Sequence, residues 1–94
     1  MAARVSIDAQ ADGLLWRCRV AVDDGGTHTV HAVTVTTADL ERWGGGATRP
    51  DVEELVRRSF GFLLERERAS SILKSFELAV IPRYFPEYEA MFRR

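Results

Sequence analysis

Cysteine and lysine are nearly absent from this 94-residue chain. Cys18 is the only cysteine, so no disulfide can form within the chain, and a lone thiol is typical of a reducing compartment. Lys74 is the only lysine among 13 basic residues, which 14 acidic residues balance to a formal charge of −1. Without a cationic excess the chain has no overall attraction for nucleic acid or anionic lipid.

Long apolar runs and low-complexity segments are also missing. No stretch approaches the roughly 20 apolar residues that span a bilayer, and residues 1–13 lack the apolar core of a signal peptide. The composition, 46% hydrophobic and 29% charged, is that of an ordinary folded protein. We therefore expect one cytoplasmic domain over residues 1–94, outside any membrane, with a thin core because the chain is small.

Residues 1–36 alternate between apolar and polar side chains, which is the pattern of half-buried strands. The alternation is cleanest over 14–22, and a run rich in Thr and Val follows over 27–36. The Asp and Gly residues between the two runs are typical of a turn. We predict a β-hairpin (14–22/27–36) within a two- or three-stranded antiparallel sheet, whose opening strand lies around Val5.

The turn also predicts a register for this hairpin. If it is centred between residues 24 and 25, Cys18 lies opposite His31 and Leu14 lies opposite Val35. The apolar residues of both strands then fall on one side, as a sheet with one buried face requires. The other side, which carries Arg17, is expected to face solvent.

A short helix and a glycine linker are expected over 37–48. Thr36 or Thr37 can cap a helix that runs through Leu40 and Trp43, and the three glycines at 44–46 end it. These glycines lack the spacing of a phosphate-binding loop, so they predict a flexible connector.

Residues 49–94 have the spacing of helices. Thr48, Pro50 and Asp51 form a helix start, and apolar residues then recur at helical spacing as far as Leu64. This pattern predicts one long helix packed across the hairpin. Shorter helical segments are expected at 70–76, 78–85 and 86–92.

Seven of the nine aromatic residues lie after residue 58. Rings at helical spacing are usually core, but so small a domain can bury few of them, and exposed apolar patches mark interfaces. We therefore identify four rings as candidate contacts with a second copy of the chain or with a partner protein: Tyr84, Phe85, Tyr88 and Phe92.

The predicted register places the Cys18 thiol beside the His31 imidazole. Such a pair can be a nucleophile with its base, but a structural zinc needs four ligands and the chain has no second cysteine. A buried thiol beside a hydrogen-bonded histidine is the ordinary interpretation. We predict no metal, no cofactor and no catalytic residue, and a small enzyme that uses Cys18 and His31 is the third alternative.

Residues 56–89 read VRRSFGFLLERERASSILKSFELAVIPRYFPEYE. This segment, about a third of the chain, resembles the tail of a family of short uncharacterised bacterial proteins with the pattern SFxFLLERE…SIL…F[DE]L…I.RYFPEY. The resemblance implies a bacterial setting and a shared architecture. It implies no site residues, because no activity comes with it.

A looser similarity links residues 33–36, 38–41, 51–57 and 62–66 to the ribbon–helix–helix proteins, which include many antitoxins. Such proteins pair one strand from each of two chains and read the DNA major groove with it. Here the glycines cut the first helix short, and the strand has His31, Thr34 and Thr36 where base-reading Arg, Lys, Asn or Gln is expected. An antitoxin-like or regulatory DNA-binding protein is therefore the second alternative.

The sequence favours an α+β domain with a small antiparallel sheet, one long helix and short C-terminal helices. It contains aromatic residues in excess and no catalytic constellation. The first hypothesis for its role is a non-catalytic protein-interaction or homo-oligomerising module of a bacterial cytoplasmic protein.

Overall fold

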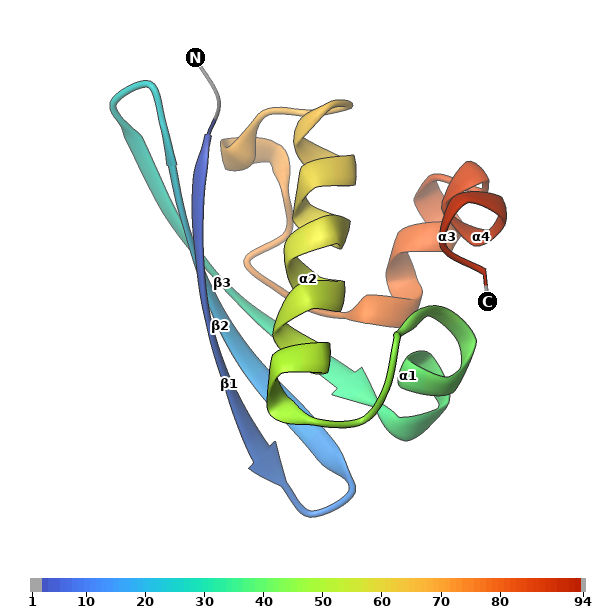
Figure 1. Ribbon diagram of the computed structural model, residues 1–94. Coiled ribbons are helices and arrows are strands. Elements are labelled where there is room, and N and C mark those ends of the chain that lie inside the picture. The colour runs from blue at the N-terminus through green and yellow to red at the C-terminus, as the bar shows by residue number, and fades with distance from the viewer. Residues whose placement is uncertain (1–2, 94) are drawn as a thin grey trace.

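Four strands form one mixed sheet in the computed structural model, which describes residues 3–93 (Figure 1). The sheet order is β1-β2-β3-β4, and β3 pairs with β4 in parallel while the other neighbours are antiparallel. The strands are β1 (Arg4–Asp12), β2 (Leu15–Asp24), β3 (Thr27–Thr36) and β4 (Ser75–Glu77). The helices are α1 (Thr37–Trp43), α2 (Arg49–Leu64), α3 (Ile81–Tyr84) and α4 (Glu87–Phe92), with 3-10 turns at Ala69–Ser71 and Leu78–Val80.

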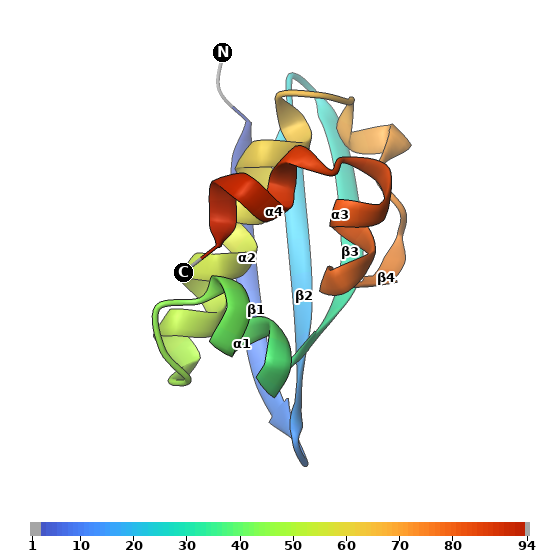
Figure 2. The same cartoon turned by 90° about the vertical axis from the view of Figure 1, so that its right-hand side faces the viewer.

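The helices described here all lie on one face of the sheet. Figure 1 shows α2 running along the strands, with α1, α3 and α4 beyond it, and Figure 2 shows α4 in front of α2 and α3 beside β3 and β4. The opposite face carries exposed side chains such as Asp8, Arg17 and Arg19. The fold is therefore α+β, as the sequence predicted, with a sheet that is covered on one side.

The fourth strand corrects the predicted antiparallel sheet of two or three strands. It lies where the sequence predicted a short helix over 70–76. The Ala32 amide donates to the Lys74 carbonyl at 2.7 Å, and Phe76 pairs with Val33. This pairing gives hydrogen-bond partners to the side of β3 that faces away from β2, which a buried backbone requires. Over three residues an apolar pattern does not distinguish a strand from a helical turn.

The hairpin of β2 and β3 is confirmed, but its predicted register is wrong by two residues. Cys18 pairs with Val33, and His31 pairs with Val20. The turn is made by Gly25 and Gly26, both with positive φ (58° and 94°), as a two-residue type I′ turn requires. A shift of two residues keeps every side chain on its face, so the predicted division into a buried and a solvent side still holds.

Leu14 does not belong to the buried face on which the alternation placed it. It is 86% exposed and forms, with Gly13, the two-residue turn between the paired residues Asp12 and Leu15. Gly13 has a φ of 63°, and glycine at the first position of a two-residue hairpin turn is typical of type II′. The first strand is consequently longer than predicted and reaches residue 12.

Both predicted helix starts are confirmed. The Thr36 hydroxyl accepts from the Asp39 amide at 3.1 Å, and the Asp39 carboxylate accepts from the Thr36 amide at 2.9 Å. Thr48 and Asp51 make the same reciprocal arrangement at the start of α2. Each capping box satisfies amides that the first helical turn leaves without partners.

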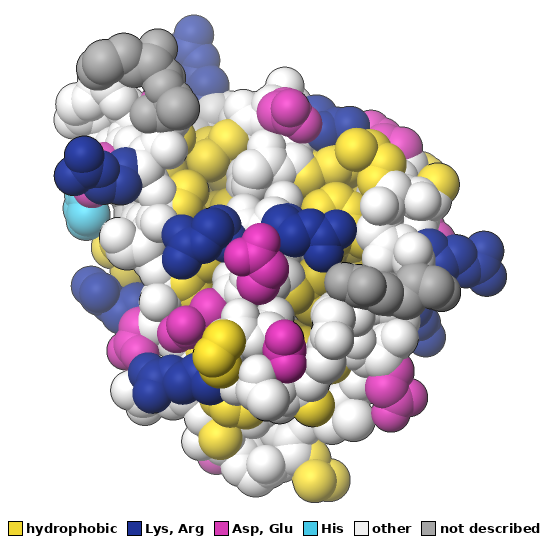
Figure 3. Space-filling model, in the orientation of Figure 1, with side chains coloured by type: hydrophobic (Ala, Val, Ile, Leu, Met, Phe, Trp, Pro, Cys, Tyr) yellow, Lys and Arg dark blue, Asp and Glu magenta, His cyan; other side chains and the backbone are white. Residues whose placement is uncertain are grey.

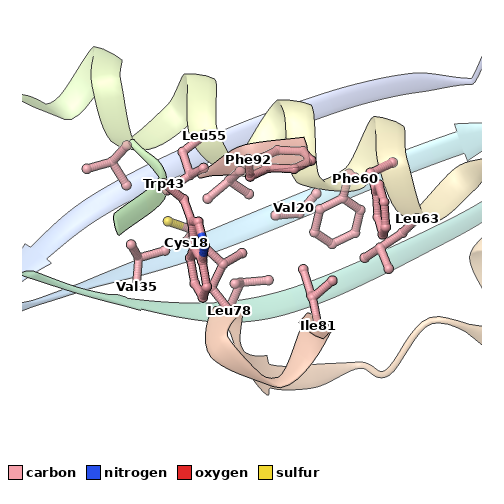
Figure 4. Close-up of a cluster of buried hydrophobic side chains, with 14 of the residues drawn as sticks. Cys18, Val20, Val35, Trp43, Leu55, Phe60, Leu63, Leu78, Ile81 and Phe92 are labelled. Carbon is pink, nitrogen blue, oxygen red and sulfur yellow. The ribbon is translucent and has the colours of Figure 1, made fainter. Parts of the chain in front are cut away.

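The core lies between the sheet and the helices. Val52, Val56 and Phe60 of α2 are fully buried, while Phe62 on another side of that helix meets rings from the C-terminal segment. This explains the wide apolar arc of α2. Figure 4 shows the Trp43 side chain of α1 inserted beside Cys18 and close to Leu78.

Membrane-spanning character is not found in residues 3–93, because no helix in this range combines the necessary length with enough apolar residues.

Candidate functional site

Cys18 lies on the covered face of β2 and is 3% exposed. Burial raises the pKa of its thiol to about 11, and the negative charges of Glu53 and Asp8 act in the same direction. Because the thiolate is the reactive form of cysteine, this thiol is protonated and unreactive at neutral pH.

His31 has a structural role that its hydrogen bonds define. Its Nδ1 lies 2.7 Å from the carbonyl oxygen of Leu73 and its Nε2 lies 2.9 Å from the hydroxyl oxygen of Thr29. A carbonyl only accepts, so Nδ1 is the donor to Leu73, and the Thr29 hydroxyl is the hydrogen-bond partner of Nε2. The ring also packs against Phe60, with centroids 5.3 Å apart. His31 therefore fastens the segment before β4 to β3.

The register separates Cys18 from His31. They are diagonal neighbours on adjacent strands, a relation in which Cα atoms lie about 7 Å apart, and His31 is only 1% exposed. Both side chains lie on the covered face of the sheet and are buried. The small-enzyme alternative is left without an accessible pair.

The four candidate interface rings fall into two classes. Tyr88 and Phe92 are core residues, 0% and 6% exposed, and their rings stack with centroids 4.1 Å apart. Tyr84 is 67% exposed, and Phe85 is half-buried with its ring edge-on to Phe62. Only Tyr84 and Phe85 are accessible to another molecule.

These two accessible rings line an apolar pocket of about 190 Å³. The pocket lies between the C-terminal end of α2, the segment before β4, and α3. Leu73 lies on the solvent side of the pocket and is 49% exposed. The other lining residues are Leu63, Glu67, Ser71, Ile72, Phe76, Val80 and Ile81.

Among residues 3–93, Glu67 is the only charged residue that lines this pocket. Burial raises the pKa of its carboxyl group above the ordinary value. Within residues 3–93 the carboxylate has neither a hydrogen bond nor an ion pair. A partly desolvated carboxylate without a partner favours a cation in an approaching molecule.

The guanidinium of Arg66, next to Glu67, contacts other residues of the same chain. It lies 3.6 Å from the centroid of the Phe62 ring, and its Nε donates to the Glu87 carboxylate at 3.0 Å. The hydrogen bond of the Glu87 carboxylate with its own backbone and, second, this contact with Arg66 lower the pKa of that carboxyl group. Arg66 thereby ties α4 to α2.

Charges on the remaining surface are mixed in sign. Figure 3 shows dark blue and magenta side chains interspersed over the exposed side of α2, where Glu54, Arg57 and Arg58 are exposed. On the open face of the sheet, Arg17 pairs with Asp12. A nucleic-acid surface usually gathers cations in one stripe, and nothing in this arrangement favours the DNA-binding alternative.

The strand of the looser ribbon–helix–helix similarity is β3, and β3 has neighbours on both sides. It pairs with β2 over its whole length and with β4 at Ala32, Val33 and Thr34. A strand from a second chain cannot occupy the position that β4 already fills.

In the described part of the chain, no group of three or more His, Cys, Asp and Glu side chains is arranged to hold a metal ion.

Of the ten residues that line the pocket, the sequence predicted only Tyr84 and Phe85 as site residues, and the eight others include Leu73 and Glu67. Leu73 belonged to a segment predicted as a helix, and Glu67 belonged to a charged run that resembles an ordinary solvated surface. A signal for Leu73 exists in its position next to the apolar Ile72, because in an extended chain consecutive side chains point to opposite sides, and burial of Ile72 turns Leu73 outward. Glu67 had no such signal, because its surroundings come from α3.

Comparisons with known proteins do not identify a family for this chain. No family model, no curated protein and no solved structure matches the chain.

Proposed function

We propose that this chain is a non-catalytic protein-interaction module, part of a bacterial cytoplasmic protein, that binds another protein chain through the pocket between α2 and α3. The observation that carries the proposal is an apolar pocket flanked by the exposed side chains of Leu73 and Tyr84. Large apolar side chains in contact with water around a concave surface mark interaction sites.

The size of the pocket favours a side chain over a free ligand. Pockets for small molecules have about 300–1,000 Å³, while this one has about 190 Å³. A cavity of about 150 Å³ holds a benzene ring, so one aromatic or aliphatic side chain fits here. A single anchoring side chain in a pocket, surrounded by further contacts, is the usual arrangement of a protein interface.

The test compares substitutions at the pocket with one elsewhere. Leu73→Ser and Tyr84→Ser are expected to weaken binding at least tenfold, because they remove apolar surface that the partner covers. Leu14→Ser is the matched control, because Leu14 is even more exposed and lies in the β1–β2 turn. Association is measured as self-association by sedimentation and as retention of a purified partner on the immobilised protein.

The proposal is wrong if neither kind of association occurs, or if Leu73→Ser and Tyr84→Ser bind as well as the unaltered chain. Far-UV and near-UV circular dichroism of each variant checks that the fold is intact. Both side chains are largely exposed, so substituting them leaves the core unchanged.

A further inference from the structure

The surface around the pocket carries two complementary pairs, a ring with a pocket that fits a ring and a cation with an anion. Tyr84 is an exposed ring beside an apolar pocket that fits one ring. Arg83 is exposed, and Glu67 lines the pocket; within the described residues neither side chain has an ion-pair partner. A patch that carries both halves of a contact is self-complementary.

We propose that the occupant of the pocket is a second copy of this chain, which inserts Tyr84 into the pocket and places Arg83 against Glu67. This inference rests on the proposed function and names the partner. The same contacts are made in the reverse direction across a twofold axis, since in such an interface residue i contacts j and j contacts i. The dimer therefore has two inserted rings and two ion pairs.

The spacing along α3 allows both contacts at once. Arg83 and Tyr84 are consecutive, so their Cα atoms are about 3.8 Å apart. Consecutive side chains of a helix leave its axis about 100° apart, so when the ring enters the pocket the guanidinium lies beside it and reaches the pocket margin through the length of the arginine side chain. The planar guanidinium matches a carboxylate with two parallel hydrogen bonds.

Burial explains why the pair contributes to specificity. Glu67 is already partly desolvated in the single chain, as the raised pKa of its carboxyl group indicates. A cation at this position compensates a charge that has lost part of its hydration. A partner without a cation beside its anchoring side chain leaves that carboxylate unpaired, which is unfavourable in an interface.

The experiment measures the dimer dissociation constant by sedimentation equilibrium over a concentration series. Glu67→Arg and Arg83→Glu are each expected to raise the dissociation constant at least tenfold, because each places like charges together. The double variant E67R/R83E restores the pair with reversed signs and is expected to recover most of the affinity. Arg68→Glu is the matched control, since Arg68 is exposed and adjacent in sequence to Glu67.

Three outcomes overturn the inference. The first is a dimer that the single charge reversals and Tyr84→Ser leave unchanged, because it uses another face. The second is a double variant no tighter than the single ones. The third is a monomer at every concentration; if Tyr84→Ser then still abolishes binding of a different protein, the proposed function stands without the second copy. If the unaltered chain associates neither with itself nor with another protein, both the inference and the proposed function are wrong.

Discussion

At the scale of single residues, the Tyr88 hydroxyl is a polar group of the core with a defined hydrogen-bond partner. It lies 2.7 Å from Ser59 Oγ, which itself donates to the Leu55 carbonyl at 2.8 Å. Ser59 has one hydroxyl proton, and the Leu55 carbonyl receives it. Tyr88 is therefore the donor and Ser59 the acceptor in the bond between them.

This assignment predicts a coupled pair. Ser59→Ala leaves a buried phenol without an acceptor and is expected to lower the free energy of unfolding by about 1–2 kcal/mol. Tyr88→Phe removes the donor and is expected to cost about 1 kcal/mol. The double variant should cost less than the sum of the two, because no group is left unpaired. Urea unfolding measures all four proteins, and strict additivity would show that the bond does not form.

Cys18 predicts a loss of stability at alkaline pH. The folded chain holds the thiol proton up to a pKa of about 11, whereas the ordinary value is 9.0. Between these values the unfolded chain binds fewer protons, so the free energy of unfolding falls as the pH rises. The fall from pH 8 to pH 10 is expected to be about 1 kcal/mol.

The control for this prediction is Cys18→Ala. It removes the titrating group, so the part of the slope due to the thiol disappears whatever the absolute stability of the variant. Burial also raises the pKa of Tyr88 above its ordinary value of 10.0, which is why the comparison stops at pH 10. Equal slopes for the two proteins would contradict the buried, protonated thiol.

At the scale of elements, β1 is an edge strand whose open side is covered by side chains of α2. The Glu53 carboxylate accepts from the Ala9 amide at 3.3 Å, and Arg57 donates to the Val5 carbonyl at 2.9 Å. An uncovered edge offers its free amides and carbonyls to a strand from another molecule. The two side chains therefore protect this edge from intermolecular pairing.

Removing this cover is expected to promote aggregation. The double variant E53A/R57A exposes one amide and one carbonyl of β1 to other chains, and it should aggregate several-fold faster under agitation at 37 °C. Thioflavin T fluorescence and light scattering follow the process. A double variant at Glu54 and Arg68, which are exposed and form no hydrogen bond with β1 among the described residues, is the control. Equal rates in the two proteins would show that the edge is not what is protected.

The sequence predicted those elements whose signals repeat over many residues. Alternation over ten positions identified β2 and β3, and threonine caps identified α1 and α2. The exact pairing depended on which residues take positive φ, and two adjacent glycines adopt it more easily than an Asp-Gly pair does. The strand β4 was missed because three residues carry too little pattern and its partner lies far away in the sequence.

The residues of the candidate site were likewise predicted only in part. The sequence identified the aromatic segment, and Tyr84 and Phe85 do line the pocket. It did not distinguish Tyr84 from Tyr88, because the two are the same residue type at helical spacing. The two rings lie in different helices, because the chain leaves helical geometry at Phe85 between α3 and α4, and only Tyr88 packs against Phe62 of α2.

At the scale of the whole molecule, the C-terminal segment completes the core. Tyr88 contacts Trp43 of α1, Phe62 of α2 and Phe92 of α4, with ring centroids 4.1–5.3 Å apart. A chain that ends at Phe85 loses two buried rings worth about 2–3 kcal/mol each. That loss is comparable to the whole stability of a small domain, about 5–15 kcal/mol.

Such a truncated chain is expected to lose its near-UV circular dichroism and its cooperative urea transition. A chain that ends at Phe92 is the control and should unfold like the unaltered protein. If the shorter chain keeps the same urea midpoint, the aromatic segment is an attachment to the core and not a part of it.

The hydrogen bond between His31 and the Leu73 carbonyl joins positions 42 residues apart. Contacts of such separation form late, because a long stretch of chain must be ordered before they stabilise anything. The hairpin, by contrast, closes through short turns. During synthesis the apolar face of the first three strands therefore emerges well before the residues that cover it. Partial chains at that stage are the species most exposed to misassembly, so a chaperone that protects strands would act on this protein before its final residues have been made.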